Sequence, residues 1–197
     1  MLIVLLLHVS LALPSTPALP PGILRTAVAE AAGLWSPYGV AVDVAAPFDS
    51  AQDRTCGWAP DDSAVLTVVA IETRRTVSSR APAGWRGALG AITFDPNGTP
   101  APVITVFLTD MERFIADTEV LGAHEWQWPP SLHDEVVGRV LGRVLAHEIG
   151  HFVLRMRGHA DVGLMRQVLS ANDMVEPSRR GFALSRKEAE RLKEARR

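Results

Sequence analysis

The chain has 197 residues, a length that fits one globular domain. Hydrophobic residues make up 47% and charged residues 21%, which excludes a disordered, collagen-like or coiled-coil protein as the main architecture. The formal net charge of -2 gives no basic surface for nucleic acid, so we expect no nucleic-acid partner. The one cysteine, Cys56, can form neither an internal disulfide nor a multi-thiolate metal site. Any metal must therefore be held by nitrogen and oxygen atoms.

The apolar run from Leu2 to Leu13 has two interpretations. It is too short to cross a bilayer but suits a signal peptide, which would place the protein in a secreted or periplasmic compartment. No Lys or Arg precedes it, however, and a short Leu/Ile/Val run that ends at prolines is also typical of a buried strand. We favour the strand slightly. The compartment stays open: secreted or periplasmic if residues 1–13 are a signal segment, and otherwise cytoplasmic. No later segment approaches transmembrane length, so we expect no membrane span.

The next part of the chain predicts one helix followed by several strands. The helix should cover 23–35 and end at Ser36-Pro37, because the residue before proline avoids the α region. Strands are expected at 39–46, 64–71, 88–94 and 103–108. Loops should connect them at 47–63, which contains Cys56, and at 78–87. The turn signal at 95–98 favours direct pairing of the last two strands as a hairpin.

The longest helix is predicted over 132–154. Ser131 and Asp134 have the spacing of a capping box, and apolar side chains recur from there at helical intervals. Gly138 and Gly142 lie one turn apart inside this helix, and each costs about 1 kcal/mol relative to Ala. We therefore expect another element to pack closely against that face.

Two segments flank this helix. Residues 116–130 should form a loop or short helix, with Trp126 and Trp128 in core or lid packing. His124 and the nearby His133 are expected to be surface or turn histidines. A short amphipathic helix over 185–197 should end the chain, anchored by two leucines, Leu184 and Leu192.

The long helix contains the sequence His147-Glu148-Ile149-Gly150-His151, which is H-E-x-x-H. At about 100° per residue, the two histidines lie about 40° apart, so both imidazoles can bind one ion. Glu148 falls beside the pair and not among the ligands. Zn²⁺ suits nitrogen ligands and activates water, whose proton Glu148 can accept as a general base. The pattern predicts hydrolysis of an amide.

A stable zinc site with one open position needs a third protein ligand. His159 is the first candidate, because Gly158 can end the helix in the left-handed conformation and turn the chain back toward the metal. Asp161 is the second candidate. Met165, in Gly163-Leu164-Met165, would then form an apolar floor beneath the zinc.

These residues resemble the metzincin-type zinc metallopeptidases, which follow H-E-x-x-H with a third histidine and a methionine-containing turn. His147, Glu148, His151, His159 and Met165 match in type and order, although His159 lies eight residues after His151 where the family has six. The full pattern H-E-x-x-H-x7-H-x3-G-L-M looks like that of a group of small bacterial metzincin-like proteins.

The resemblance implies an α/β (α+β) metzincin-like fold over 1–197 as a single domain. It would have a mixed twisted sheet of four to five strands, one backing helix, a long zinc-binding helix, a Met-turn and a C-terminal helix. It also implies a monomeric zinc metalloendopeptidase that acts on a peptide or protein substrate. The substrate would bind along an edge strand, for which 88–94 is the candidate, although an ordinary internal strand fits this segment equally well.

Two other hypotheses compete with a peptidase. One is a non-catalytic, zinc-stabilised peptide-binding module on the same fold. The presence of Glu148 favours the peptidase over it, because a binding module has no need of a carboxylate there. The other is a metal-free helical interaction domain with the histidines at the edge of its core. Cys56 could act as a nucleophile or as a ligand in a latent enzyme, but a buried thiol is the commoner role.

Overall fold

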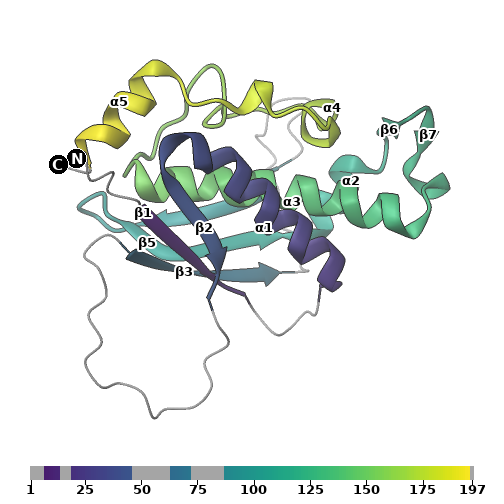
Figure 1. Cartoon of the computed structure of the whole chain (residues 1–197), viewed down its shortest axis with the longest axis horizontal. Coiled ribbons are helices and arrows are strands. Elements are labelled where there is room, and N and C mark those ends of the chain that lie inside the picture. The colour runs from purple at the N-terminus through teal and green to yellow at the C-terminus, as the bar shows by residue number, and fades with distance from the viewer. Residues whose placement is uncertain (1–6, 14–18, 46–62, 72–86, 196–197) are drawn as a thin grey trace, which may run out of the picture.

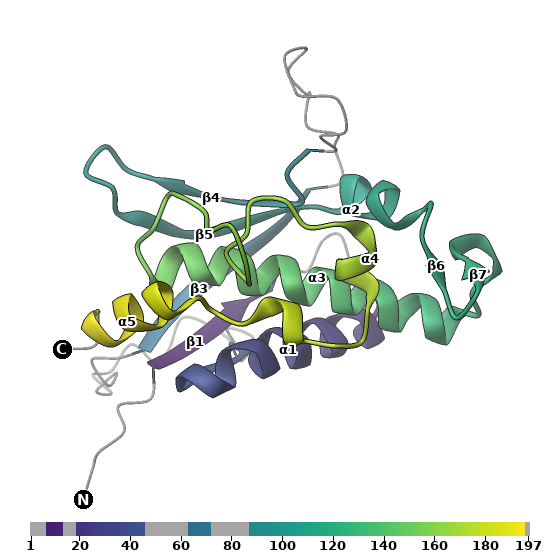
Figure 2. The same ribbon diagram turned by 90° about the horizontal axis from the view of Figure 1, so that it is seen from above.

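The computed structural model describes residues 7–13, 19–45, 63–71 and 87–195. These residues form a layered, mixed α/β fold (Figure 1). Helices α1 (Pro21–Trp35) and α3 (Pro130–Val153) pack side by side over the main sheet. The C-terminal segment, with α4 (Ala171–Val175) and α5 (Arg186–Glu194), lies on the far side of α3 from the sheet (Figure 2). The predicted α/β class is confirmed.

The main sheet has five strands in the order β2-β1-β3-β5-β4. The strands are β1 (Leu7–Ala12), β2 (Val40–Val44), β3 (Ser63–Ile71), β4 (Gly90–Phe94) and β5 (Pro100–Phe107). Strand β1 pairs in parallel with β2 on one side and β3 on the other, and β3 pairs in parallel with β5. Residues 7–12 of the apolar N-terminal run thus form an interior strand, as the strand interpretation predicts.

The predicted hairpin is confirmed, because β4 runs antiparallel to β5. In the turn between them, the Gly98 N–H donates to the Asp95 carbonyl at 3.0 Å, and Gly98 has a φ of 87° that favours glycine. Among the described strands, β4 lies at one edge of the sheet with β5 as its one neighbour.

A short helix, α2 (Leu108–Ile115), follows β5 and was not predicted. It buries Leu108, Met111 and Ile115, whose spacing of three and four residues is a helical signal that the sequence does contain. A small two-stranded sheet then forms from β6 (Glu119–Val120) and β7 (Ala123–His124), followed by a 3-10 turn at Glu125–Gln127.

The long helix α3 begins differently from the prediction. Its first residue is Pro130 and its N-cap is Pro129, so the predicted capping box of Ser131 and Asp134 is wrong. Proline is well suited to the first helical turn, because it lacks an N–H that would need a capping partner. The predicted C-terminal helix is confirmed as α5, where Ser185 and Glu188 form a capping box; Leu184 and Leu192 are both buried.

Small residues at every fourth position of α3 form its contact with α1. A Cβ on Gly138 would lie 2.8 Å from the Ile23 carbonyl oxygen, and one on Gly142 would lie 2.5 Å from the Ala27 carbonyl oxygen. Further along the same stripe, the Ala146 carbonyl accepts a hydrogen bond from the Trp35 indole at 3.0 Å. The expected close packing against the two glycines is confirmed.

The predicted loops at 47–63 and 78–87 lie almost wholly outside the described residues, and so does Cys56. No helix in the described part of the chain is both long and apolar enough to cross a membrane.

The glycine contact gives a stability prediction for Gly142→Ala. Backbone atoms of α1 meet the new methyl group and cannot rotate away, so we expect a net loss of about 1–3 kcal/mol in unfolding free energy, despite the gain of about 1 kcal/mol in helix propensity. Urea denaturation measures the loss. Gly181→Ala is the control, because no atom lies within 4 Å of that position. Equal stability of both variants would contradict tight α1–α3 packing.

Candidate metal site

His147 and His151 lie one turn apart on α3, and their Nε2 atoms approach to 3.1 Å. Ligand nitrogens about 2.0–2.1 Å from a tetrahedral metal are separated by about 3.3 Å. The helical spacing therefore places the two Nε2 atoms at about the separation expected for two ligands of one ion, which agrees with the prediction from the sequence.

Backbone carbonyls fix the orientation of both rings. The His147 Nδ1 lies 2.8 Å from the Leu164 carbonyl oxygen, and the His151 Nδ1 lies 2.5 Å from the Met156 carbonyl oxygen. Because a carbonyl can only accept, each Nδ1 carries the proton and donates it. The lone pair of each neutral ring is therefore on Nε2, the atom that faces the other histidine.

His159 completes the cluster, as predicted. The ligand atoms of His147, His151 and His159 all lie within 4.8 Å of one another, so these residues form a possible three-histidine metal site. The His159 ring stacks beside that of His147 at 5.3 Å between centroids. Asp161, the second candidate, is not part of this group.

The chain returns to His159 by a different turn from the one predicted at Gly158. Gly158 does not have a positive φ; the left-handed residue is Arg155, at φ 46°, just after the end of α3. From α5, the Arg191 guanidinium donates to the carbonyls of Leu154 at 2.6 Å and Arg155 at 3.0 Å. These bonds satisfy the end of the helix and stabilise a conformation in which glycine would otherwise be preferred.

The environment keeps the three imidazoles neutral. Burial is the main cause that lowers the pKa of His147 to about 4, and the neighbouring imidazoles of His151 and His159 lower it further. Burial also lowers the pKa of His151 and that of His159. At neutral pH the rings are therefore unprotonated, which is the state that a metal needs.

Glu148 lies beside the histidines and is 5% exposed. Burial raises the pKa of its carboxyl group to about 8, and a hydrogen bond with the backbone of Ile92 in β4 opposes this rise. A Cβ at Gly90, also in β4, would lie 3.0 Å from the Glu148 Oε1. The missing side chain at Gly90 thus leaves room for the carboxyl group, a contribution that the sequence did not reveal.

Met165 is fully buried under this part of α3. A Cβ at Gly150 would lie 2.2 Å from its sulfur, so the absence of a side chain at Gly150 makes this contact possible. The preceding residue, Leu164, supplies the carbonyl that binds His147. Gly163, at φ 79°, allows the sharp turn before them.

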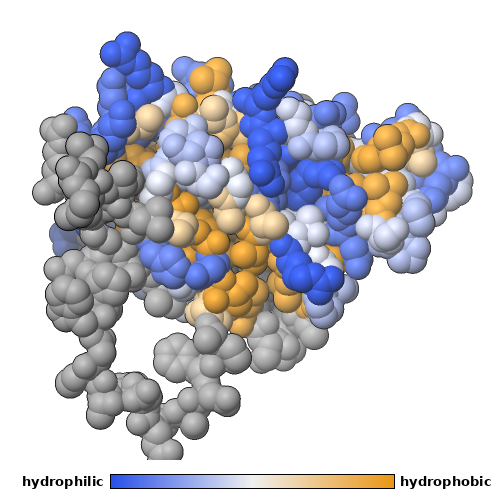
Figure 3. Space-filling view, viewed as in Figure 1, coloured by the Kyte–Doolittle hydropathy of each residue, from blue (hydrophilic) through white to orange (hydrophobic). Residues whose placement is uncertain are grey.

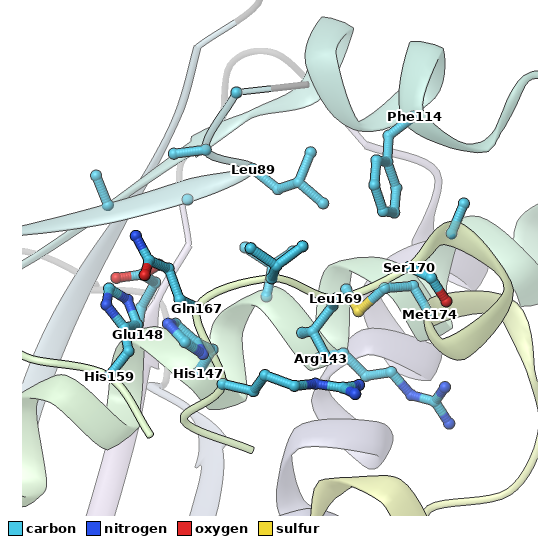
Figure 4. A pocket seen from close by; sticks show the side chains of 18 of the residues that line it. Leu89, Phe114, Arg143, His147, Glu148, His159, Gln167, Leu169, Ser170 and Met174 are labelled. Atoms are coloured by element: carbon cyan, nitrogen blue, oxygen red, sulfur yellow. The ribbon is translucent and has the colours of Figure 1, made fainter. Parts of the chain in front are cut away.

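The cluster opens into a cavity of about 910 Å³ (Figure 4). His147, Glu148 and His159 lie at one end, and the opposite end is lined by apolar side chains of Phe114, Leu169 and Met174. The walls come from β4, from the end of α2 and from residues between 166 and 174, which include most of α4. A chain segment in this cavity would therefore contact Glu148 and the imidazoles at one end. At the other end it would contact apolar side chains together with Arg143 and Ser170.

The remaining predicted candidates lie outside the cluster. His124 contacts Glu119 at 3.4 Å, and His133 contacts Glu125 at 3.5 Å. Both rings are partly exposed, as expected of surface histidines. Trp128 is buried, as predicted for core packing, but Trp126 is exposed and the same prediction is wrong for it.

No family model matches the sequence, and no curated protein matches it.

The buried carboxyl group predicts how stability depends on pH in chelator-treated protein. The folded pKa of Glu148, about 8, exceeds its ordinary value of 4.5, so folding favours the protonated form. The wild type should lose stability relative to Glu148→Gln as the pH rises through this window, because the glutamine does not titrate. Urea denaturation of both proteins between about pH 5 and 8 measures this difference. A difference that does not change with pH would contradict the burial of an ionisable group here.

The ligand set predicts the outcome of metal titration. Wild-type protein should bind one equivalent of zinc, and excess zinc should raise its melting temperature because the folded state alone has the assembled site. His159→Ala should lose most of this zinc to a competing chelator, while Asp161→Ala should retain it. Metal analysis after equilibrium dialysis distinguishes the two variants. Loss of zinc from Asp161→Ala but not from His159→Ala would show that Asp161, and not His159, is the third ligand.

Proposed function

We propose that the chain is a zinc-dependent peptidase with a metzincin-like site. The observation that carries the proposal is the pairing of two features in one cavity. Three imidazoles converge with two of their Nδ1 atoms held by backbone carbonyls, and the buried carboxyl group of Glu148 lies beside them. Neither feature alone would distinguish catalysis from structural metal binding.

The donor set fits zinc better than a harder cation. Imidazole nitrogen is a preferred zinc ligand, whereas magnesium and calcium select oxygen. Three protein ligands leave a fourth position open, as in catalytic sites, while structural zinc sites close with four protein ligands. Within the described residues, this cluster contains three histidines and no fourth side chain.

When bound there, zinc supplies a Lewis acid that activates water and polarises the carbonyl group of an amide. Glu148 takes the proton from the attacking water and then transfers it to the leaving amine, so that the peptide nitrogen departs as a neutral group. Beside a divalent cation the pKa of Glu148 falls below its metal-free value, because a nearby positive charge favours the carboxylate. The Nδ1 bonds of His147 and His151 fix the orientation of the two rings, so that their Nε2 atoms would hold the ion.

The position of β4 supports a peptide as the substrate. It is an edge strand, it lines the cavity with residues 90–92 and 94, and its Ile92 backbone contacts Glu148. An extended peptide that adds to this edge would place a backbone amide next to the carboxyl group. Specificity within the cavity would then come from the apolar end beside Phe114 and Met174.

The test compares Glu148→Gln with wild-type protein, both loaded with zinc, on a library of quenched fluorescent peptides. We expect unchanged zinc content and a loss of turnover of about 100-fold or more, because general acid–base catalysis contributes about 10²–10⁴-fold. Glu135→Gln, an exposed position on the same helix, is the matched control and should retain full activity.

Two results would contradict the proposal. Full turnover by Glu148→Gln would remove this carboxyl group from the mechanism. A wild-type protein that binds zinc and peptides but cleaves none of them would instead be the zinc-stabilised binding module.

A further inference from the structure

A rigid apolar projection lies beyond the far end of the cavity. We call residues 119–127, which comprise β6, β7 and the following 3-10 turn, the β6–β7 tip. Figure 3 shows apolar surface over this end of the molecule. Leu121 is 91% exposed and Trp126 is 76% exposed, the two highest values among the large apolar side chains of the described residues.

The backbone of the tip and the exposed Trp126 ring are held in place. The buried Trp128 donates its indole N–H to the Ala123 carbonyl at 2.8 Å, and the His124 N–H donates to the Gln127 side chain at 3.0 Å. The Trp126 ring stacks on that of His124 with an interplanar angle of 13°. A side chain that is already ordered loses little conformational entropy when a partner binds.

The backbone at Leu121 is unfavourable for its residue type. Leu121 has φ 55° and Gly122 has φ 77° in the two-residue turn between β6 and β7. Positive φ at both positions defines a type I′ turn, for which Asn-Gly is the preferred sequence. Leucine at the first position of this turn therefore destabilises the fold and exposes an apolar side chain. The stability of the fold does not explain why a leucine is present there.

The surroundings of the tip are acidic. Residues 112–135 contain six carboxylates and one arginine, Arg113. The acidic residues are Glu112, Asp117, Glu119, Glu125, Asp134 and Glu135, of which Glu135 forms an ion pair with Arg139. An apolar projection among negative charges disfavours anionic lipid headgroups and favours a partner that carries both apolar and basic side chains.

The tip continues directly from the wall of the cavity. Asp117 and Thr118 line the cavity, and β6 begins at the next residue. The tip touches α3 near its start, where Glu125 contacts His133, fourteen residues before His147. That separation corresponds to about 21 Å along the helix axis, or about six residues of extended peptide.

We propose that the β6–β7 tip is a second binding site for the protein substrate, one that holds a segment with apolar and basic side chains more than about six residues from the cleaved bond. This inference rests on the proposed peptidase function. The tip would contribute affinity without contact with the reacting atoms, so it would discriminate long substrates from short ones.

The experiment uses an octapeptide that the wild type cleaves near its centre, which is too short to reach the tip. Two further series of peptides carry an eight-residue extension at the N-terminus or at the C-terminus of the octapeptide. In one series the extension alternates lysine and leucine, and in the other glutamate replaces the lysine. We expect the lysine extension, at one of the two ends of the octapeptide, to lower KM about tenfold relative to the octapeptide and to leave kcat unchanged. A tryptophan that becomes buried on binding, as Trp126 would, is among the side chains that contribute most to affinity. The glutamate series should give no gain.

Trp126→Ser and Leu121→Asn should abolish this gain and leave cleavage of the octapeptide unchanged. Leu121→Asn should also unfold at an equal or higher urea concentration, because asparagine suits the turn; a merely structural role for Leu121 predicts the opposite. Val44→Ser, at an exposed apolar position on β2, is the control and should retain the gain.

A fluorescent lysine–leucine segment alone should also bind zinc-loaded Glu148→Gln and not the same protein with Trp126→Ser, which measures docking without turnover. Cleavage of all peptides with one KM would overturn this inference alone, whereas a zinc-loaded wild type that cleaves no peptide, short or extended, would overturn the proposed function. Binding to lipid vesicles that depends on Trp126 would show that the tip binds a membrane, and a Trp126-dependent dimer at high concentration would show that it binds a second copy of the chain. Either result would overturn the inference of a substrate-binding site.

Discussion

The contact between α3 and α1 is the constraint on which the rest of the structure depends. Gly138, Gly142, Ala146 and Gly150 recur every fourth residue, so one side of α3 has almost no side chains. Backbone of α1 fills the first part of this stripe, and Trp35 and Met165 fill the last part. With that side occupied, the neighbouring sides of α3 present the histidines and Glu148 to the cavity beside β4. Close packing thereby sets the orientation of the catalytic candidates.

A buried ion network holds the C-terminal segment against the two helices. The Arg143 guanidinium is fully buried and binds Glu30 of α1 at 2.9 Å, and Arg179 binds the second oxygen of Glu30 at 2.7 Å. Arg143 also donates to the carbonyls of Asp173 and Ser178. A buried charge is tolerated when it is paired and hydrogen-bonded in this way. Because this segment also forms one wall of the cavity, the network shapes the site that lies one turn further along α3.

The site combines parts that differ in their origin. The helix provides two imidazoles and a carboxyl group, the returning chain provides His159, and separate loops provide the carbonyls that orient the rings. Burial makes the imidazoles neutral and the carboxyl group protonated in the absence of metal, so the cluster carries little charge before an ion binds. The same cavity extends to α2 and to Asp117 and Thr118, the residues just before the β6–β7 tip.

The sequence by itself determined what depends on local periodicity. H-E-x-x-H places His147 and His151 on one face of any helix, and Gly138 with Gly142 indicates a close neighbour, whatever that neighbour is. Other features were decided by contacts between distant segments: the left-handed Arg155 stabilised by Arg191, the room for Glu148 left by Gly90, and the pairing of Arg143 with Glu30. Even Trp126 and Trp128, two residues apart, have opposite exposures, because the Trp128 ring packs into the core and donates to the Ala123 carbonyl, whereas the Trp126 ring stacks on His124 at the surface. Short-range pattern fixes which way a side chain points from its own element, whereas burial and pairing depend on what the rest of the chain brings beside it.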